Sequence, residues 1–335
     1  FEKLALPSGK KTKTGYATGA DVLDALEDKN PIITAVKEYR EVTKLKSTYA
    51  DGLVKVIEPD GRIRSSFQMT ATETGRLSST EPNLQNIPVR RPLGARLRSM
   101  FVAEEGNVLV DADYSQIELR LLAHIAQDSE MIAAFNSGED FHTYTAARVF
   151  GLTPIEVTPT LRSRAKAVNF GVVYGISAFS LSKDIGTTVA QAKEYMDSYF
   201  ARFSGVRAYM ADVVERARRD GFVTTLFGRR RYLPELRSSD HNVRAFGERV
   251  ALNMPIQGTA ADIMKIAMIN TCRALEEIPG ARLILQVHDE LIVECREEDS
   301  ARAAKVLRAG MEGAASLSVP LTAEAAVGKS WAECK

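Results

Sequence analysis

Two short stretches far apart in the chain each place a carboxylate at the end of an apolar β run. The first is Val110 to Glu118, which holds Asp113, and the second is Leu285 to Val293, which holds Asp289. Neither stretch can hold a metal ion alone. If strand ends bring them together, the two aspartates form a carboxylate pair suited to two divalent cations, as in two-metal phosphoryl transfer. Because Mg²⁺ takes one or two carboxylates together with phosphate oxygens and water, two aspartates suffice.

Each aspartate also has a purely structural interpretation. Asp289 lies with His288 and Glu290 in an expected three-residue hairpin tip, where aspartate is common without any function. That interpretation leaves Glu290 unexplained, because two adjacent acids repel unless a cation or an arginine is close. Asp113 stands where a strand gives way to a helix, so it can serve as the helix N-cap. Since His288 lacks the partners of a metal ligand, we assign it to a nucleic-acid contact.

Between the acidic stretches, two cations and two aromatic residues recur at every fourth position: Arg162, Lys166, Phe170 and Tyr174. On a helix this spacing puts all of them on one broad face. The two cations can hold a triphosphate, and the two aromatic rings can face a sugar and stack on a base. A row of aromatic residues is more often part of a core, but a core face would not carry two cations. Lys166 can also protonate the departing pyrophosphate, which unchanged turnover and pH profile in Lys166→Leu would rule out.

The elements that must position these residues are strands at both ends of the chain. A β run at 107–113 leads into a helix that carries Ile117, Leu121, Leu122 and Ile125. Near the other end, strands are expected at 281–287, 291–295 and 319–325, with an Ala-rich helix before the last. Two further strands, at 53–57 and 62–69, are expected to flank a turn at 58–61.

The middle of the chain, 124–277, is expected to be rich in helix. It is interrupted by an arginine-rich hairpin from Phe222 to Leu233, turning near Gly228, and by Pro255, which should end or kink one helix. Together these elements predict the α+β class, with a discontinuous β-containing domain and a helical insertion.

The composition sets broad limits on the class of protein. At 335 residues the chain is long enough for two or three subdomains, and no apolar run is long enough to span a bilayer. Three cysteines without metal-ligand spacing fit a reducing cytoplasm. The net charge of +1 does not by itself indicate nucleic acid, but segregated charges allow a basic groove with an acidic centre. Because the chain begins with Phe1, we expect it to be a piece of a longer protein.

Several motifs, in this order, resemble those of the A-family DNA polymerases. Asp111 to Arg120 resembles motif A of that family, Arg162 to Gly175 resembles motif B, and Val287 to Glu290 resembles motif C. The resemblance extends across essentially the whole chain. Further matching segments are Thr74 to Ser79, Asn83 to Pro88 and Asn253 to Asp262.

The resemblance implies a right-hand polymerase fold of the α+β class, with an antiparallel β palm, inserted helical fingers and a partial thumb. The implied domains are a partial thumb at 1–56, the first part of the palm at 57–123, the fingers at 124–277 and the second part of the palm at 278–335. Neither a proofreading nor a 5′-nuclease activity is expected in this piece.

The resemblance also implies a role for each matching residue. Asp113 and Asp289 are the catalytic, metal-binding carboxylates, and the carbonyl of Tyr114 is a further ligand, for two Mg²⁺ ions that Mn²⁺ can replace. Glu118 closes against a ribose 2′-hydroxyl and so selects deoxynucleotides. The residues expected to bind the incoming nucleotide are Arg162, Lys166, Phe170, Tyr174, His142, Gln116 and Glu118. The residues expected to contact primer–template DNA, partly through the minor groove, are Arg76, Asn83, Gln85, Arg249, Asn253, Gln257 and His288.

The implied function is DNA-templated DNA polymerisation with release of pyrophosphate, in replication and repair. The implied partners are primer–template DNA and deoxynucleoside triphosphates, without a membrane, for a monomer in the bacterial cytoplasm and nucleoid. Phe170, where tyrosine is the alternative, implies discrimination against dideoxynucleotides.

Three other functions stay open. A single-subunit RNA polymerase shares the carboxylates and the Arg/Lys helix, but it leaves the position of Glu118 small. A metal-dependent nuclease uses paired aspartates but does not need the helical stripe. A DNA-binding module without catalysis fits a piece that lacks most of a thumb.

Overall fold

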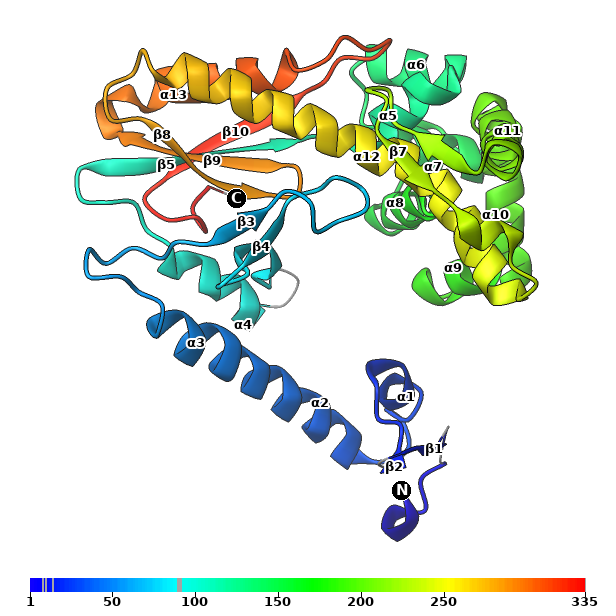
Figure 1. Cartoon of the computed structure of the whole chain (residues 1–335). Helices are drawn as coiled ribbons and strands as arrows, with labels where there is room; N and C mark the ends of the chain where they lie inside the picture. The colour runs from blue at the N-terminus through cyan, green and yellow to red at the C-terminus, as the bar shows by residue number, and fades with distance from the viewer. Residues whose placement is uncertain (8, 10, 14, 89–91, 335) are drawn as a thin grey trace. The chain divides into compact units, whose positions relative to one another are not determined.

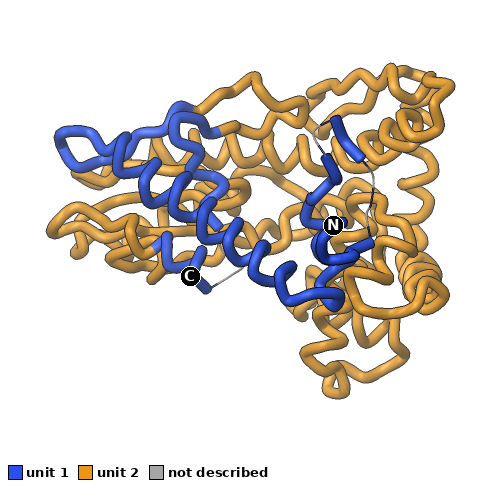
Figure 2. Tube along the Cα trace, turned by 90° about the horizontal axis from the view of Figure 1, so that it is seen from below, with its two compact units in different colours: residues 1–66, 79–98 blue, residues 67–78, 99–335 orange. Residues whose placement is uncertain are grey.

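The computed structural model describes residues 1–7, 9, 11–13, 15–88 and 92–334. The chain forms two compact units, coloured separately in Figure 2: residues 1–66 with 79–98, and residues 67–78 with 99–335. The second unit holds most of the chain, including both acidic stretches. The division into thumb, palm and fingers at the boundaries given above stays a prediction.

The first unit is mainly helical. The Asn30 side chain caps α2 (Pro31–Lys44) by accepting a hydrogen bond from the backbone N–H of Ile32 at 3.0 Å. The helix continues through the π-helical η2 (Leu45–Ala50) into α3 (Asp51–Val54), so the strand expected at 53–57 is wrong. Continuous helical hydrogen bonding outweighs the β-rich composition there. The turn at 58–61 is present, since the N–H of Gly61 donates to the carbonyl of Glu58 at 2.9 Å.

The other short elements among residues 1–100 complete this part of the chain. They are η1 (Glu2–Leu4), β1 (Lys11–Thr12), β2 (Gly15–Tyr16), α1 (Ala20–Asp24), β3 (Ser66–Gln68), β4 (Ser78–Thr80), η3 (Leu84–Asn86), α4 (Pro92–Ala95) and η4 (Arg96–Met100).

The second unit contains a four-stranded antiparallel sheet in the order β10-β5-β9-β8. Its strands are β5 (Asn107–Tyr114), β8 (Arg282–Val287), β9 (Glu290–Arg296) and β10 (Ala323–Gly328). The last strand begins later than the expected 319, because Pro320 has no N–H to donate to a ladder. Glu290 pairs with Val287, so the hairpin tip consists of His288 and Asp289 alone, and the expected three-residue tip is wrong.

The helical part of this unit lies between β5 and β8 in the sequence. Its elements are α5 (Ile117–Ala126), α6 (Ser129–Asn136), α7 (Phe141–Phe150), η5 (Pro154–Glu156), α8 (Pro159–Val173), α9 (Ala178–Asp184), α10 (Val189–Arg202), α11 (Ser204–Asp220), β6 (Phe222–Thr224), β7 (Arg230–Tyr232), η6 (Pro234–Arg237) and α12 (His241–Leu275); η7 (Glu297–Asp299) and α13 (Ser300–Glu312) follow β9. Polar side chains cap the helices that matter for the site: Asp140 caps α7, and Thr158 caps α8. The arginine-rich hairpin is confirmed as β6 and β7, with Gly228 at a positive φ of 83°.

Pro255 does not end a helix. It lies inside α12, which continues for twenty residues to Leu275. A proline removes one backbone hydrogen bond, but Ala251, Met254 and Ile256 are buried around it, and their packing offsets that loss.

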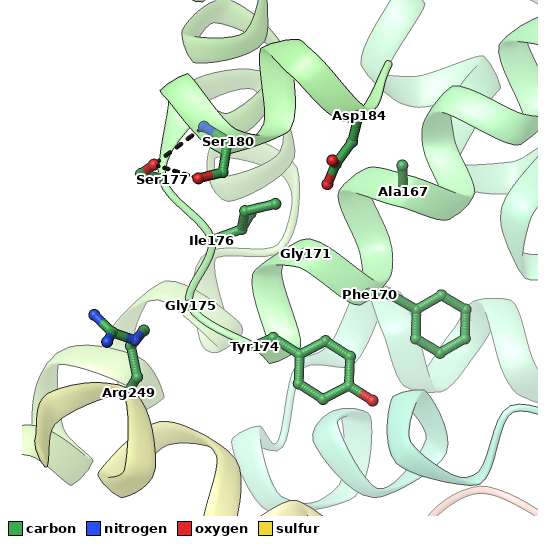
Figure 3. A pocket seen from close by; sticks show the side chains of 10 residues that line it. All are labelled: Ala167, Phe170, Gly171, Tyr174, Gly175, Ile176, Ser177, Ser180, Asp184 and Arg249. Atoms are coloured by element: carbon green, nitrogen blue, oxygen red, sulfur yellow. Dashed lines mark hydrogen bonds between the residues drawn. The ribbon is translucent and has the colours of Figure 1, made fainter. Parts of the chain in front are cut away.

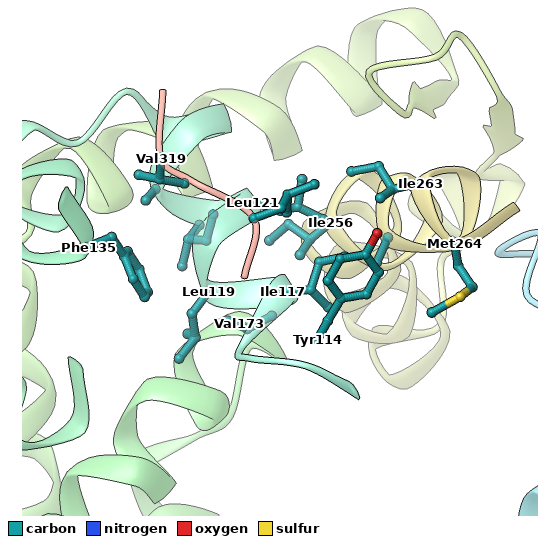
Figure 4. Close-up of a cluster of buried hydrophobic side chains, with 14 of the residues drawn as sticks. Tyr114, Ile117, Leu119, Leu121, Phe135, Val173, Ile256, Ile263, Met264 and Val319 are labelled. Atoms are coloured by element: carbon teal, nitrogen blue, oxygen red, sulfur yellow. The ribbon is translucent and has the colours of Figure 1, made fainter. Parts of the chain in front are cut away.

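One face of the sheet forms the core together with α12 and α13, which lie along it in Figure 1. Because side chains alternate along a strand, Val110, Ala112 and Tyr114 of β5 face this core, and Asp111 and Asp113 face the other way. Figure 4 shows Tyr114, Ile117 and, from α12, Ile263 among the side chains of this core. Within the described ranges, no helix combines the length and the apolar character needed to cross a membrane.

Candidate active site

Sheet register brings the two aspartates together. Asp113 is the penultimate residue of β5 and pairs with Glu290 of β9, next to the hairpin tip that holds Asp289. The backbone N–H of Tyr114 donates to the carbonyl of Asp289 at 3.0 Å, which ties the tip to the end of β5. Burial, and then the nearby charge of Asp113, raise the pKa of Asp289 to about 7. The two carboxylates therefore repel each other inside a partly desolvated site.

This donor set fits hard divalent cations. The two carboxylates are oxygen ligands whose mutual repulsion a cation would relieve. Tyr114 can offer only its backbone carbonyl, because its hydroxyl is buried and donates to the carbonyl of Met311 at 2.6 Å. Among the described residues no group of three His, Cys, Asp or Glu side chains could hold an ion. Such a pair leaves coordination positions for phosphate oxygens and water.

Glu118 forms the third acidic position of the site. It is 6% exposed, at the start of α5, and its carboxylate accepts hydrogen bonds from Arg76 at 2.7 Å and from the Tyr174 hydroxyl at 2.7 Å. Burial, followed by the charge of Glu118, raises the pKa of Tyr174, so the hydroxyl stays protonated as the donor. The sequence predicted each of these residues separately but not the bonds among them.

Arg162, Lys166 and Phe170 lie on α8 as predicted, and Tyr174 is the C-cap of that helix. Side chains at the start of α7 hold this stripe. Arg162 donates to the Asp140 carboxylate through Nε at 3.0 Å and Nη2 at 2.7 Å. Although burial opposes ionisation of Asp140, hydrogen bonds from Arg162 and Thr143 hold its pKa at about 2. Lys166, one turn further along α8, is exposed.

His142 is buried against the same helix. It is 3% exposed, its Nδ1 lies 3.0 Å from the Asn169 amide nitrogen, and its ring is tilted against Phe170 with centroids 5.8 Å apart. Burial lowers the pKa of His142 to about 4. His142 is therefore neutral near pH 7, and it can offer a hydrogen bond but no positive charge to a phosphate.

A pocket of about 510 Å³ opens beside the end of α8 (Figure 3). Phe170 lines it from α8, Tyr174 from the C-cap of that helix, and Arg249 from α12. The full lining is Ala167, Phe170, Gly171, Tyr174, Gly175, Ile176, Ser177, Ser180, Asp184 and Arg249. The structure thus brings Arg249 to the aromatic end of the stripe.

The other predicted contact residues lie in three places. Asn253 and Gln257 follow Arg249 along α12 at intervals of four, so these three share a face. His288 is exposed at the hairpin tip with a φ of 53°, and Gln116 precedes α5 with a φ of 56°.

Asn83 and Gln85 belong to the first unit, where both make local hydrogen bonds. The Asn83 side chain accepts from the backbone N–H of Gln85 at 3.0 Å, and the Gln85 side chain accepts from the N–H of Ser79 at 3.2 Å.

Sequence reasoning missed Trp331, the only tryptophan of the chain. Its indole N–H donates to Glu290, the neighbour of Asp289, at 2.5 Å, and its ring meets Phe101 edge-on. Glu290, beside the aspartates, is therefore bonded to a residue 41 positions further along the chain. No pattern in the sequence signals this contact.

These features define a class of protein before any comparison: an α+β fold that holds two neighbouring aspartates at the end of a sheet, together with a helix that carries two cations and two aromatic residues. A family profile described as DNA polymerase family A matches residues 1–333. The chain is 51% identical to DNA polymerase I of Bacillus subtilis (strain 168) over 338 residues, covering 100% of this chain and 38% of that protein. It is 50% identical to the thermostable DNA polymerase I of Thermus aquaticus, covering 100% of this chain and 40% of that protein.

A solved structure agrees with these sequence comparisons. It is described as the POL domain of Pol1 from M. smegmatis in complex with DNA primer-template and dNTP, and it is 48% identical with a TM-score of 0.93. The match covers 100% of this chain and 59% of that one. The chain belongs to DNA polymerase family A, and its fold is the α+β polymerase fold that the sequence predicted. It spans about two fifths of the length of the relatives it matches.

Proposed function

We propose that this chain carries a DNA-templated DNA polymerase activity, which adds deoxynucleotides to a primer 3′-hydroxyl and releases pyrophosphate. The observation that carries the proposal is that Asp113, at the end of β5, lies close to Asp289 in the hairpin tip, whose pKa is raised by burial and by the Asp113 charge, beside Glu118. Membership of the family and the likeness to a POL domain described in complex with primer-template and dNTP support it.

Asp113, Asp289 and the Tyr114 carbonyl would hold two Mg²⁺ ions, with Mn²⁺ as a substitute. When bound, such ions make the primer hydroxyl more acidic and neutralise charge on the phosphates. The chain's own residues bind and orient the reactants. Arg162 offers a planar fork to the triphosphate, and Asp140 already holds that fork in place.

The remaining nucleotide contacts follow from their places on the helices. Lys166 supplies a point charge to the triphosphate and a proton to the departing pyrophosphate, and buried His142 donates a hydrogen bond. Phe170 packs on the sugar and Tyr174 stacks at the insertion site, while Gln116 lies nearby. Glu118, held by Arg76 and Tyr174, excludes a 2′-hydroxyl.

The primer–template would be held by the shared face of α12, the hairpin tip and two segments before β5. The residues in these places are Arg76, Asn83, Gln85, Arg249, Asn253, Gln257 and His288. We place the activity in DNA replication and repair, in a monomer of the bacterial cytoplasm associated with the nucleoid. Phe170 makes the chain discriminate against dideoxynucleotides. Incorporation of a dideoxy terminator as readily as its deoxy counterpart would refute this.

Primer extension tests this proposal. A labelled primer–template is incubated with Mg²⁺ and deoxynucleotides, beside Asp113→Asn, a ribonucleotide reaction and a reaction without nucleotides. Template-directed products that vanish in Asp113→Asn support the proposal. Preference for ribonucleotides would indicate an RNA polymerase, loss of labelled DNA without nucleotides a nuclease, and DNA binding without turnover a binding module.

A further inference from the structure

A tight turn before β4 carries Arg76. The N–H of Gly75 donates to the carbonyl of Thr72 at 3.3 Å, and the Thr72 hydroxyl donates to the carbonyl of Arg76 at 2.6 Å. Gly75 has a φ of +80°, which favours glycine. We call residues 72–76 the Gly75 turn. Its conformation decides where the Arg76 guanidinium points.

Two cations from distant parts of the chain hold this turn. A Cβ on Gly75 would lie 2.5 Å from Nε of Arg229, so that guanidinium lies directly against the glycine. The ammonium of Lys265, on α12, donates to the carbonyl of Gly75 at 2.5 Å. Burial, and then the nearby charge of Arg229, lower the pKa of Lys265. Lys265 is therefore hydrogen-bonded to this turn, and the guanidinium of Arg229 lies against it.

A nearly buried carboxylate fixes Arg229 in turn. Asp262 of α12 is 8% exposed and accepts from Nε and Nη2 of Arg229 at 3.0 and 2.6 Å. Its other oxygen accepts from the Thr225 hydroxyl at 2.8 Å, which joins the β6–β7 hairpin to the same helix. The residue that meets Gly75 thus has little freedom to move.

The opposite side of the turn reaches the site, where Arg76 and Tyr174 both donate to Glu118. A continuous set of contacts therefore runs from α12 through Gly75 to Glu118. We propose that Lys265 and Arg229 are positioning residues, which hold the Gly75 turn so that Arg76 fixes the Glu118 carboxylate, and that they thereby set selection between deoxy- and ribonucleotides. This inference rests on the proposed polymerase function and on the proposed role of Glu118.

Lys265→Met is the sharpest test, because it removes the ammonium, keeps a similar length and leaves the Arg229–Asp262 pair intact. Its matched control is Lys193→Met, which removes an exposed ion pair to Asp197 on α10. Single-nucleotide incorporation gives kcat and KM for a deoxynucleotide and for its ribonucleotide, and thermal unfolding reports stability. Selectivity is the ratio of the two kcat/KM values.

Lys265→Met should lower selectivity by about fivefold or more, which corresponds to about 1 kcal/mol of lost discrimination. Gly75→Ala, which drives a methyl group into Arg229, should lower it too, whereas Lys193→Met should leave it unchanged. In a Glu118→Gln background, Lys265→Met should change selectivity by less than about twofold, because the two residues act through one path. If Lys265→Met lowers kcat/KM equally for the deoxynucleotide and the ribonucleotide, selectivity is preserved and the inference is overturned. The contacts would then serve only the stability of the fold.

A second measurement separates this inference from the proposed function. If the wild-type chain extends no primer, the polymerase proposal fails, but the contacts can still be tested by unfolding. Lys265→Met and Arg76→Met should then destabilise the chain non-additively, because both act on one turn. Additive effects would overturn the positioning role.

Discussion

The two halves of the candidate site are held in place in different ways. The carboxylate half lies at the ends of strands, where sheet register and the bond from Tyr114 N–H to the Asp289 carbonyl fix the backbone. The helix half lies on α8, where side chains at the start of α7 hold it: Asp140 holds Arg162, and His142 meets Asn169. The backbone therefore fixes the positions of the residues in the sheet half, whereas side-chain contacts fix them in the helix half.

Their electrostatics differ in the same way. Asp140 has a cation beside it, and its pKa is about 2. Asp289 has burial and a second acid beside it, and its pKa is about 7. The helix half is thus neutralised within the protein, whereas the sheet half holds a repulsion that an external cation would remove. An arrangement of this kind favours the binding of cations, but it makes the folded chain less stable when no cation is bound.

Replacing Asp289 should abolish activity that depends on the sheet half, and it should reveal the stability lost to repulsion between the two aspartates. Asp289→Asn should lower primer extension by more than about 100-fold, because even outer-shell partners of metal ions are worth 10- to 100-fold. With chelator at pH 8 the same variant should be more stable than wild type, by on the order of 1 kcal/mol, because a folded pKa above the unfolded one costs stability once pH exceeds both.

The sign of that effect follows from proton counts. Between pH 3.8 and about 7 the folded state binds more protons at Asp289 than the unfolded state, so stability falls as pH rises through this range. Mg²⁺ should restore stability to wild type more than to the variant, and the fluorescence of Trp331, bonded to Glu290, should report its binding. If Asp289→Asn loses activity and is also less stable than wild type in chelator, the electrostatic difference between the two halves is contradicted.

Replacing Arg162 should weaken the helix half without touching the sheet half. Arg162→Ala should raise KM for the deoxynucleotide by about 10- to 100-fold, because charged hydrogen bonds are worth about 1.5–3 kcal/mol. Arg164→Ala, on another side of α8, is the matched control and should leave KM within about threefold. Mg²⁺-dependent stabilisation should be unchanged in both. Equal KM effects in the two variants would mean that net charge, and not the stripe, binds the nucleotide.

The sequence predicted the parts of the site that depend on local pattern. The four-residue spacing from Arg162 to Tyr174 predicted one helical face, and the apolar run before Asp113 predicted a strand that leads into a helix. It failed where neighbours override local preference. Residues 53 and 54 are the end of a helix rather than the start of a strand, and Glu290 joins its strand instead of the hairpin tip.

Side-chain partners distant in sequence were beyond prediction. Nothing in the chain marks Asp140 as the partner of Arg162, or Trp331 as the partner of Glu290. Such pairs depend on how helices and chain ends pack, and a single sequence carries no periodic signal for that. The fold and the closeness of the two aspartates were therefore predictable, while the side-chain contacts around them were not.

The pH dependence of stability should reveal His142, whose pKa burial lowers to about 4. Its folded pKa lies below the ordinary value of 6.5, so the unfolded state binds more protons between these values and stability falls as pH drops from 6.5. Between pH 6.5 and 5, His142→Gln should remove about 1 to 2 kcal/mol of this loss. Unfolding free energies of both proteins at several pH values test it; parallel curves would show that His142 is not neutral and buried.

The smallest effect should come from Tyr174, whose hydroxyl donates to Glu118 and so connects the helix half to the sheet half. Tyr174→Phe keeps the ring and removes that bond, so it should destabilise the chain by about 0.5–1.5 kcal/mol, with α8 otherwise intact. Tyr232→Phe, at a 64% exposed position on β7, is the control and should change stability by less than about 0.5 kcal/mol. If Tyr174→Phe and Tyr232→Phe have the same free energy of unfolding, the hydrogen bond from Tyr174 to Glu118 contributes nothing to stability. The two halves are then joined by the backbone alone. If Tyr174→Phe alone is destabilised, and the loss shrinks in an Arg76→Met background, then Glu118 is held by both donors together.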